Sequence, residues 1–151
     1  MAGNGRELKK IRLIYISLSF LLLTMGMCGY LFFRDFSSIV LFAWMPGLPV
    51  PASPHIPLST DTIWGYLLVF NLPHGLWSLS GLLVIRAIWL TDTKWRAIYG
   101  GIFFVVISAL EISQLSEDRR GTFDTLDLAS YGVSAFVESI TYNLFIRRKL
   151  R

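Results

Sequence analysis

The sequence has few charged residues and a single cysteine. Only 16% of its 151 residues are charged, whereas 54% are hydrophobic. Because Cys28 stands alone, the chain has neither an internal disulfide framework nor a zinc site built from cysteines. It also has no Gly-rich phosphate loop, no HExxH-like zinc motif and no Ser or Cys nucleophile motif. These absences exclude the common soluble hydrolases, nucleotide-binding enzymes and disulfide-rich domains.

The excess of positive charge is small and dispersed. The net charge is +4, and most Lys and Arg residues flank apolar runs. Charges in such places act as orientation signals in membrane proteins and do not form a nucleic-acid-binding face. We therefore expect the lipid bilayer, and no nucleic acid, as a partner.

Long apolar runs dominate what is present, and they indicate transmembrane helices. We expect four spans, at about residues 11–33, 74–90, 95–115 and 126–145, within one integral membrane domain that covers 1–151. The first run has the charge order of a signal peptide, but it is too long and lacks an A-x-A site, so we expect it to stay uncleaved. The predicted fold class is all-α: a polytopic membrane protein with four transmembrane helices in a small bundle and a Pro-rich outer loop.

The second span contains two polar residues whose roles need interpretation. Asn71 suits a helix N-cap and Pro73 suits a first helical turn, so we expect the span to begin near His74 and to end at Leu90. Arg86 lies about a turn before that end. The prediction for Arg86 is snorkelling to the nearby water interface, with pairing to an acidic residue as the alternative.

Residues 34–61 hold five of the six prolines. Proline lacks the backbone N–H that a membrane-embedded helix requires, so this segment is not a regular span. We expect an interfacial or re-entrant piece over one face of the bundle. Both a substrate lid and a plain surface loop fit it.

The distribution of Lys and Arg predicts the orientation. Placing both termini in the cytoplasm leaves only Arg34, Arg119 and Arg120 outside, as the positive-inside rule favours. The Pro-rich loop, the stretch 111–127 and His74 then share the outer face of the membrane.

The stretch 111–127 is the main polar interruption of the apolar sequence. Glu111 and Gln114 share one helical face because they are three residues apart. Asp124 and Asp127 have the same spacing at the start of the fourth span, where helix N–H groups favour carboxylates and Asp124 suits an N-cap. Gly121 permits a tight reversal between the two helices. We expect the two pairs to face each other.

A polar stripe continues along the fourth span. Its members recur at helical spacing and predict a face turned to the bundle interior: Asp127, Tyr131, Ser134, Glu138 and Tyr142. Glu138 lies near mid-membrane, where an unpaired charge is costly. We expect it to be protonated or paired with Arg86, and favour both over a proton relay.

Four interpretations of the polar stretch remain open. In an enzyme, Glu111 or Asp124 acts as acid or base, Asp127 orients, and Arg119 or Arg120 holds an anionic group. In a metal site, the three carboxylates and His74 are the ligands. In a binding site, the arginines, with Gln114 and His74, hold an anionic lipid or a cell-wall precursor. In a structural clasp, arginines pair with carboxylates. The sequence identifies no cofactor, metal or protein partner.

These residues also resemble a known family. The pattern Glu111-x-x-Gln114, then an arginine, then Asp124-x-x-Asp127 resembles the motif of the VanZ-like membrane proteins. The segment Pro73–Gly81, with Leu76-Trp77 and Ser80, is similar to that family's second motif region.

The departures from the family pattern indicate a divergent member. Tyr131 and Ser134 stand where the family has Asn and Gly, and its His–Tyr pair is not reproduced. The resemblance implies a bacterial multi-span membrane protein, in a family named for a member associated with teicoplanin resistance. We therefore expect an outward-facing polar pocket that binds or modifies a lipid-linked or anionic cell-envelope molecule. The alternative is a non-enzymatic membrane scaffold or subunit.

Overall fold

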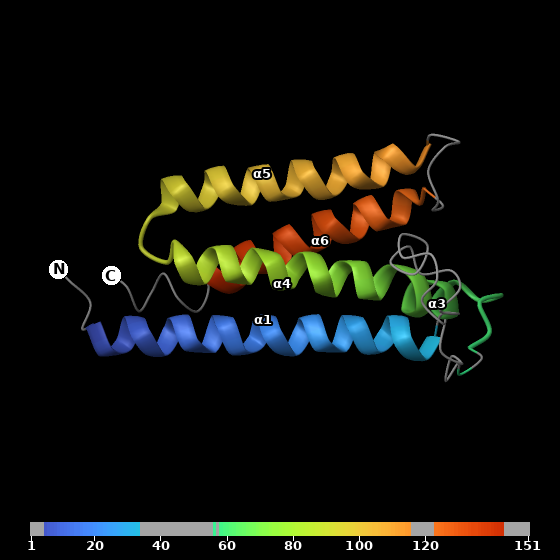
Figure 1. Cartoon of the computed structure of the whole chain (residues 1–151), viewed down its shortest axis with the longest axis horizontal. Helices are drawn as coiled ribbons and strands as arrows, with labels where there is room; N and C mark the ends of the chain where they lie inside the picture. Colours follow the sequence, from blue (N-terminus) through green and yellow to red (C-terminus); the bar gives the residue numbers. More distant parts are fainter. Residues whose placement is uncertain (1–4, 34–55, 57, 116–122, 144–151) are drawn as a thin grey trace, which may run out of the picture.

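The structure is a computed structural model that describes residues 5–33, 56, 58–115 and 123–143. Every regular element in these ranges is helical, which confirms the all-α class (Figure 1). In chain order the elements are α1 (Gly5–Phe33), α3 (Ile63–Tyr66), the π-helical turn η2 (Leu67–Asn71), α4 (Leu72–Ile88), α5 (Thr93–Ile112), the 3₁₀ turn η3 (Ser113–Leu115) and α6 (Thr125–Thr141).

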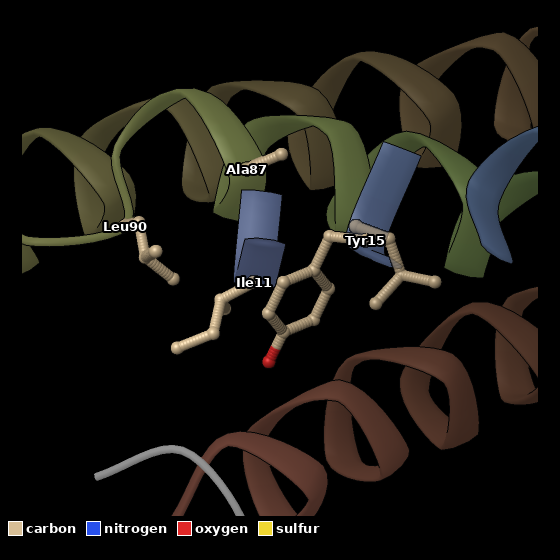
Figure 2. Packing of buried hydrophobic residues seen from close by; sticks show 5 residues of the cluster. Ile11, Tyr15, Ala87 and Leu90 are labelled. Atoms are coloured by element: carbon tan, nitrogen blue, oxygen red, sulfur yellow. The ribbon is translucent and has the colours of Figure 1, made fainter. Parts of the chain in front are cut away.

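Helix α4 is the centre of the bundle. It makes its most extensive contacts with α1 on one side and α6 on the other, while α5 packs more loosely (Figure 1). The apolar core lies between α1 and α4, as Figure 2 shows, and consists of Ile11, Tyr15, Leu83, Ala87 and Leu90.

Three helical segments are long and apolar enough to cross a membrane: Gly5–Phe33, Ile63–Ile88 and Thr93–Leu115. Their apolar side chains are mostly on the outside, with Phe20 70% exposed and Val105 65% exposed. An exterior of this kind fits lipid rather than water. Helix α6 has 17 described residues and carries buried acids, so the count of four spans stays a prediction. Residues 34–55 and 57 of the Pro-rich segment, with the predicted lid, lie outside the described ranges.

The helical segment that carries the predicted second span begins at Ile63 and not near His74, while the bounds of the span in a bilayer stay a prediction. Thr62 caps the segment by accepting a hydrogen bond from the Gly65 N–H (3.1 Å). The helix then runs through Pro73 because one turn widens to a π-helix, with the Leu72 N–H bonded to the Leu67 carbonyl. The wider turn relieves the conflict between a proline ring and the carbonyl four residues earlier. Asn71 therefore lies inside a continuous helical segment.

Arg86 is buried, and the predicted snorkelling is wrong. Its side chain is 1% exposed, and its Nε donates to Oε1 of Glu138 on α6. Arg86 lies on the face of α4 that α6 covers, where the Glu138 carboxylate accepts its hydrogen bond. The alternative prediction, an Arg86–Glu138 pair, is confirmed.

The polar stripe of α6 faces the bundle interior, as predicted. The buried residues of this helix are Asp127, Tyr131, Ser134 and Glu138. The Ser134 hydroxyl donates to the Gly75 carbonyl of α4 (2.8 Å). On the opposite side of α4, the hydroxyls of Ser19 and Ser80 lie 2.9 Å apart. Polar contacts thus join α4 to both of its neighbours.

Gly26 allows α1 to approach α4, and replacing it is expected to destabilise the bundle. A Cβ at this position would overlap the Trp77 indole. We expect Gly26→Ala to cost about 1–3 kcal/mol, the usual penalty of overpacking. Gly101→Ala is the matched control, because no atom lies within 4 Å of its Cβ position and helix propensity alone favours alanine by about 1 kcal/mol. Thermal unfolding in detergent measures both; a Gly26→Ala variant as stable as Gly101→Ala would contradict the close packing.

Breaking the Arg86–Glu138 pair is expected to be more costly than removing it altogether. Arg86→Met leaves an uncompensated buried carboxylate and should cost about 3–5 kcal/mol. The double variant Arg86→Met, Glu138→Leu should recover most of that loss, because neither charge is then left alone. Denaturant unfolding of the parent, both single variants and the double variant measures the coupling. Simple additivity of the two single losses would disprove it.

Candidate functional site

A polar cluster lies at the end of the bundle where α5 ends and α6 begins, here called the Asp124 end. Side chains from all the main helices meet there: Tyr30, Tyr66, Asn71, His74, Glu111, Gln114, Asp124 and Asp127. We refer to these eight residues as the polar cluster.

Glu111 ties the end of α5 to the start of α6. The residue is 2% exposed. Its Oε1 accepts a hydrogen bond from the Asp124 backbone N–H (3.2 Å), and its Oε2 accepts one from the Gln114 side-chain amide (3.0 Å). Both oxygens are thus occupied by donors. The predicted proximity of the Glu111–Gln114 pair to the start of α6 is confirmed.

Asp124 is the N-cap of α6, as its position predicts. Its Oδ1 accepts from the Leu126 N–H (2.8 Å), and its Oδ2 accepts from the Tyr66 hydroxyl (2.7 Å) and the Asn71 amide (3.3 Å). Burial raises the pKa of Asp124, but these hydrogen bonds and the nearby His74 outweigh it and lower the pKa below the ordinary 3.8. The carboxylate is held in its ionised form.

Asp127 orients His74. Its Oδ1 lies 2.7 Å from the Asn71 amide nitrogen, which donates to it, and 3.0 Å from Nδ1 of His74. The same Nδ1 lies 2.8 Å from the Phe70 carbonyl. Because both of these neighbours are acceptors, Nδ1 carries a proton. The carboxylate and the carbonyl together fix the tautomer and the direction of the ring.

The other imidazole nitrogen faces a tyrosine. Nε2 of His74 lies 2.7 Å from the Tyr30 hydroxyl, which donates to it when the ring is neutral. Tyr30 stacks on Trp77 with ring centroids 4.8 Å apart. The edge of Tyr131 meets the imidazole at 6.3 Å. Aromatic side chains therefore hold the imidazole on the sides that the polar contacts leave open.

One buried acceptor of the polar cluster lacks a partner in the described part of the chain. Asn71 is 4% exposed, and its Nδ2 donates to both aspartates. Because Nδ2 faces the carboxylates, Oδ1 points away from them and has no hydrogen-bond partner among the described residues. A buried amide oxygen in this state is costly, so the position suits a group that donates a hydrogen bond.

Five of the predicted site residues come together: His74, Glu111, Gln114, Asp124 and Asp127. Arg119 and Arg120 lie outside the described residues. Sequence reasoning missed Tyr30, Tyr66 and Asn71 as members of the site. Tyr30 follows Gly26 by four residues and so shares the helix face that meets α4, a signal that could have identified it.

The metal interpretation finds no support among the described residues. No group of three or more His, Cys, Asp or Glu side chains in these ranges is arranged to hold a metal ion. N–H and O–H donors lie between the carboxylates and hold them in place. The geometry resembles a hydrogen-bonded network more than a coordination site.

Comparison with protein-family models, curated proteins and solved structures finds no match. The likeness to the VanZ-like proteins therefore stays a prediction, which depends on the motif residues alone.

The lowered pKa of Asp124 predicts a loss of stability in acid. A carboxylate whose folded pKa is below its unfolded value contributes stability above the unfolded pKa, and that contribution disappears as pH falls through the folded pKa. Between about pH 6 and about pH 2, the unfolding midpoint of the parent should therefore fall more steeply than that of Asp124→Asn, which keeps a capping side chain.

Thermal unfolding in detergent across this pH range measures the effect. Asp92→Asn makes the same chemical change at the N-cap of α5 and controls for the loss of a capping carboxylate. Parallel curves for the parent and Asp124→Asn would show that Asp124 contributes nothing to the acid dependence.

Proposed function

We propose that the chain is a VanZ-like bacterial multi-pass protein of the cytoplasmic membrane. It has four spans, with both termini in the cytoplasm, and the polar cluster faces outward. There it binds or modifies a lipid-linked or anionic molecule of the cell envelope. The carrying observation is His74, an imidazole held by Asp127 on one nitrogen and bonded to a hydroxyl on the other.

This arrangement supports proton transfer. The Nδ1–H of His74 donates to the Phe70 carbonyl, which makes Nε2 the basic nitrogen. The Asp127 carboxylate, 3.0 Å from Nδ1, would stabilise the imidazolium that forms when Nε2 takes up a proton. The Tyr30 hydroxyl marks the place where a substrate hydroxyl would bind. In this proposal His74 is the acid or base and Asp127 is its orienting residue.

Glu111 and Asp124 have a different role in the same proposal. The predicted acid or base role would need an oxygen open to a ligand, whereas their oxygens already accept hydrogen bonds from the protein. They suit holding α5, α6 and the π-helical turn in one geometry. Gln114 supports them by donating to Glu111.

The ligand would be held by groups of two kinds. The described cluster contains three carboxylates, which repel an anion, so an anionic ligand group would be bound by Arg119 and Arg120. The unpartnered Oδ1 of Asn71 would accept a hydrogen bond from a ligand hydroxyl or amide. A lipid-linked cell-wall precursor carries both phosphate groups and such donors.

A second candidate function is a scaffold or subunit without catalysis. The observation that favours it is the saturation of Glu111 and Asp124 by donors from other elements, as expected of a structural clasp. In this case a stable partner protein would carry the activity.

Replacing His74 distinguishes these functions. His74→Gln keeps a hydrogen-bonding side chain but cannot exchange a proton, so the modification rate should fall by about 10²–10⁴-fold while thermal stability stays near the parent's. The measurement is teicoplanin susceptibility of a bacterial host, together with mass spectrometry of its lipid-linked envelope precursors, for parent and variant.

Ser113→Ala is the control, because among the described residues the Ser113 hydroxyl bonds within its own helical turn, to the Leu110 carbonyl (2.7 Å). It should behave as the parent. A stable His74→Gln protein with the full effect on the envelope would reject proton transfer at this residue. Loss of function only in variants that also unfold, such as Asp124→Ala, would favour the clasp.

A further inference from the structure

A second polar group lies where α4 ends and α5 begins, here called the Arg86 end. It is far from the polar cluster along α6, since Asp127 and Glu138 lie near opposite ends of that helix. It contains two guanidinium groups against one aromatic ring. The Cζ of Arg86 is 3.8 Å from the centroid of the Tyr142 ring, and the Cζ of Arg96 is 4.8 Å from it.

The positive charge at this end exceeds the negative charge in the described residues there. Arg86, Lys94 and Arg96 stand against Glu138 and Asp92, and the Asp92 carboxylate accepts from backbone N–H groups as the N-cap of α5. Glu138 accepts from Nε of Arg86 and compensates that one charge. Arg96 makes no ion pair in the described part of the chain, although it shares the Tyr142 ring with Arg86. Two like charges so close in a poorly solvated place repel each other unless an anion lies between or beside them.

Three buried donors at this end lack acceptors among the described residues. They are Nη1 of Arg86, Nη1 of Arg96 and the hydroxyl of Tyr15. Arg86 is 1% exposed, so water does not replace the missing acceptor at its surface. Figure 2 shows the Tyr15 hydroxyl directed toward α6, and this tyrosine lies close enough to interact electrostatically with Arg86, Glu138 and Tyr142.

The described residues supply no acceptor for these donors, so a bound ligand is the candidate that the site suggests. A guanidinium group has only donors, and a buried charged donor without a partner is among the costliest polar groups. Arg86 of α4 and Arg96 of α5 lie against the Tyr142 ring, and Tyr15 of α1 is close enough to interact with Arg86 and Tyr142, so one multivalent anion could accept from all three donors. Phosphate offers three or more acceptor oxygens and matches the planar fork of arginine.

The aromatic residues beside the site indicate its depth. Trp89, Trp95 and Tyr99 pack together at the turn between α4 and α5, with the rings of Trp89 and Tyr99 stacked at 5.4 Å. Such aromatic groups are typical of the membrane–water interface, the level at which lipid phosphates lie. Arg96 directly follows Trp95 in the sequence.

We propose that Arg86, Arg96 and Tyr15 form a binding site for a phosphate group at the Arg86 end of the bundle. Glu138 holds Nε of Arg86 and leaves Nη1 for the ligand. The phosphate comes either from a phospholipid headgroup or from free inorganic phosphate. This site is independent of the polar cluster and of the function proposed for it.

Titration of the purified full-length protein in detergent, followed by native mass spectrometry and thermal unfolding, tests this site. The probes are phosphatidylglycerol, diacylglycerol, which has the same acyl chains without phosphate, and inorganic phosphate at constant ionic strength. Arg96→Gln is the main variant, because removing a like charge beside Arg86 does not break the buried ion pair. Arg12→Gln is the control, since Arg12 is exposed at the same end of the molecule.

We expect Arg96→Gln to weaken phosphate binding roughly tenfold or more, the effect of losing one charge-assisted hydrogen bond. Arg12→Gln should bind as the parent does, and Tyr15→Phe should bind less tightly without unfolding. Binding of phosphatidylglycerol but not inorganic phosphate assigns the lipid as the source. Binding of inorganic phosphate that competes with the lipid assigns free phosphate. Binding of neither, equal binding of diacylglycerol, or equal losses in Arg96→Gln and Arg12→Gln would overturn the site.

Discussion

The structure depends on one constraint: polar groups between apolar helices must find partners inside the protein. In hydrocarbon an unpartnered polar group costs several kcal/mol, of the order of a domain's whole stability. Helix α4 meets this constraint on two sides. Its Ser80 pairs with Ser19 of α1, while Asn71 and Arg86 reach acids on α6. The central place of α4 follows from these contacts, because both neighbours are bound to it by groups that have no other acceptable environment.

The π-helical turn before Pro73 decides the geometry of the Asp124 end. An ordinary α-helix would break at this proline, and the segment before it would then separate from α4. The widened turn keeps Asn71 and His74 on one continuous support, facing α6. Single π-helical turns inside α-helices often occur at functional sites. Such a turn changes the direction in which the neighbouring side chains point. The π-helical turn thus positions Asn71 and His74, the two residues that contact Asp127.

Periodicity predicted the features of the fold that depend on the sequence of a single helix. The buried stripe of α6 and the N-cap role of Asp124 follow from spacing and residue type alone. The start of the second apolar helix and the burial of Arg86 could not be predicted in the same way: the first depends on a π-helical turn that carries the helix through Pro73, and the second on a partner in another helix. Asn71 is the clearest case: its residue type fits an N-cap, but two carboxylates from α6 use its amide instead. Tertiary contacts override a local preference that is worth about 1 kcal/mol.

The two ends of the bundle differ in the kind of buried atom that lacks a hydrogen-bond partner among the described residues. This contrast is the strongest argument that the two ends have different ligands. At the Asp124 end, donors saturate the carboxylates, and the unpartnered atom is an acceptor, Oδ1 of Asn71. At the Arg86 end, the unpartnered atoms are donors, two of them on arginines. The two ends lack different groups: Oδ1 of Asn71 needs a hydrogen-bond donor, whereas the two arginines need a negatively charged acceptor, since a neutral hydroxyl would leave their charges uncompensated. A cluster with a purely structural role would be more stable if each of its buried donors and acceptors had a partner. That role therefore does not explain the unpartnered atoms at either end. The incomplete hydrogen bonding therefore favours binding sites at both ends of α4, each defined by a group that residues 5–33, 58–115 and 123–143 do not supply.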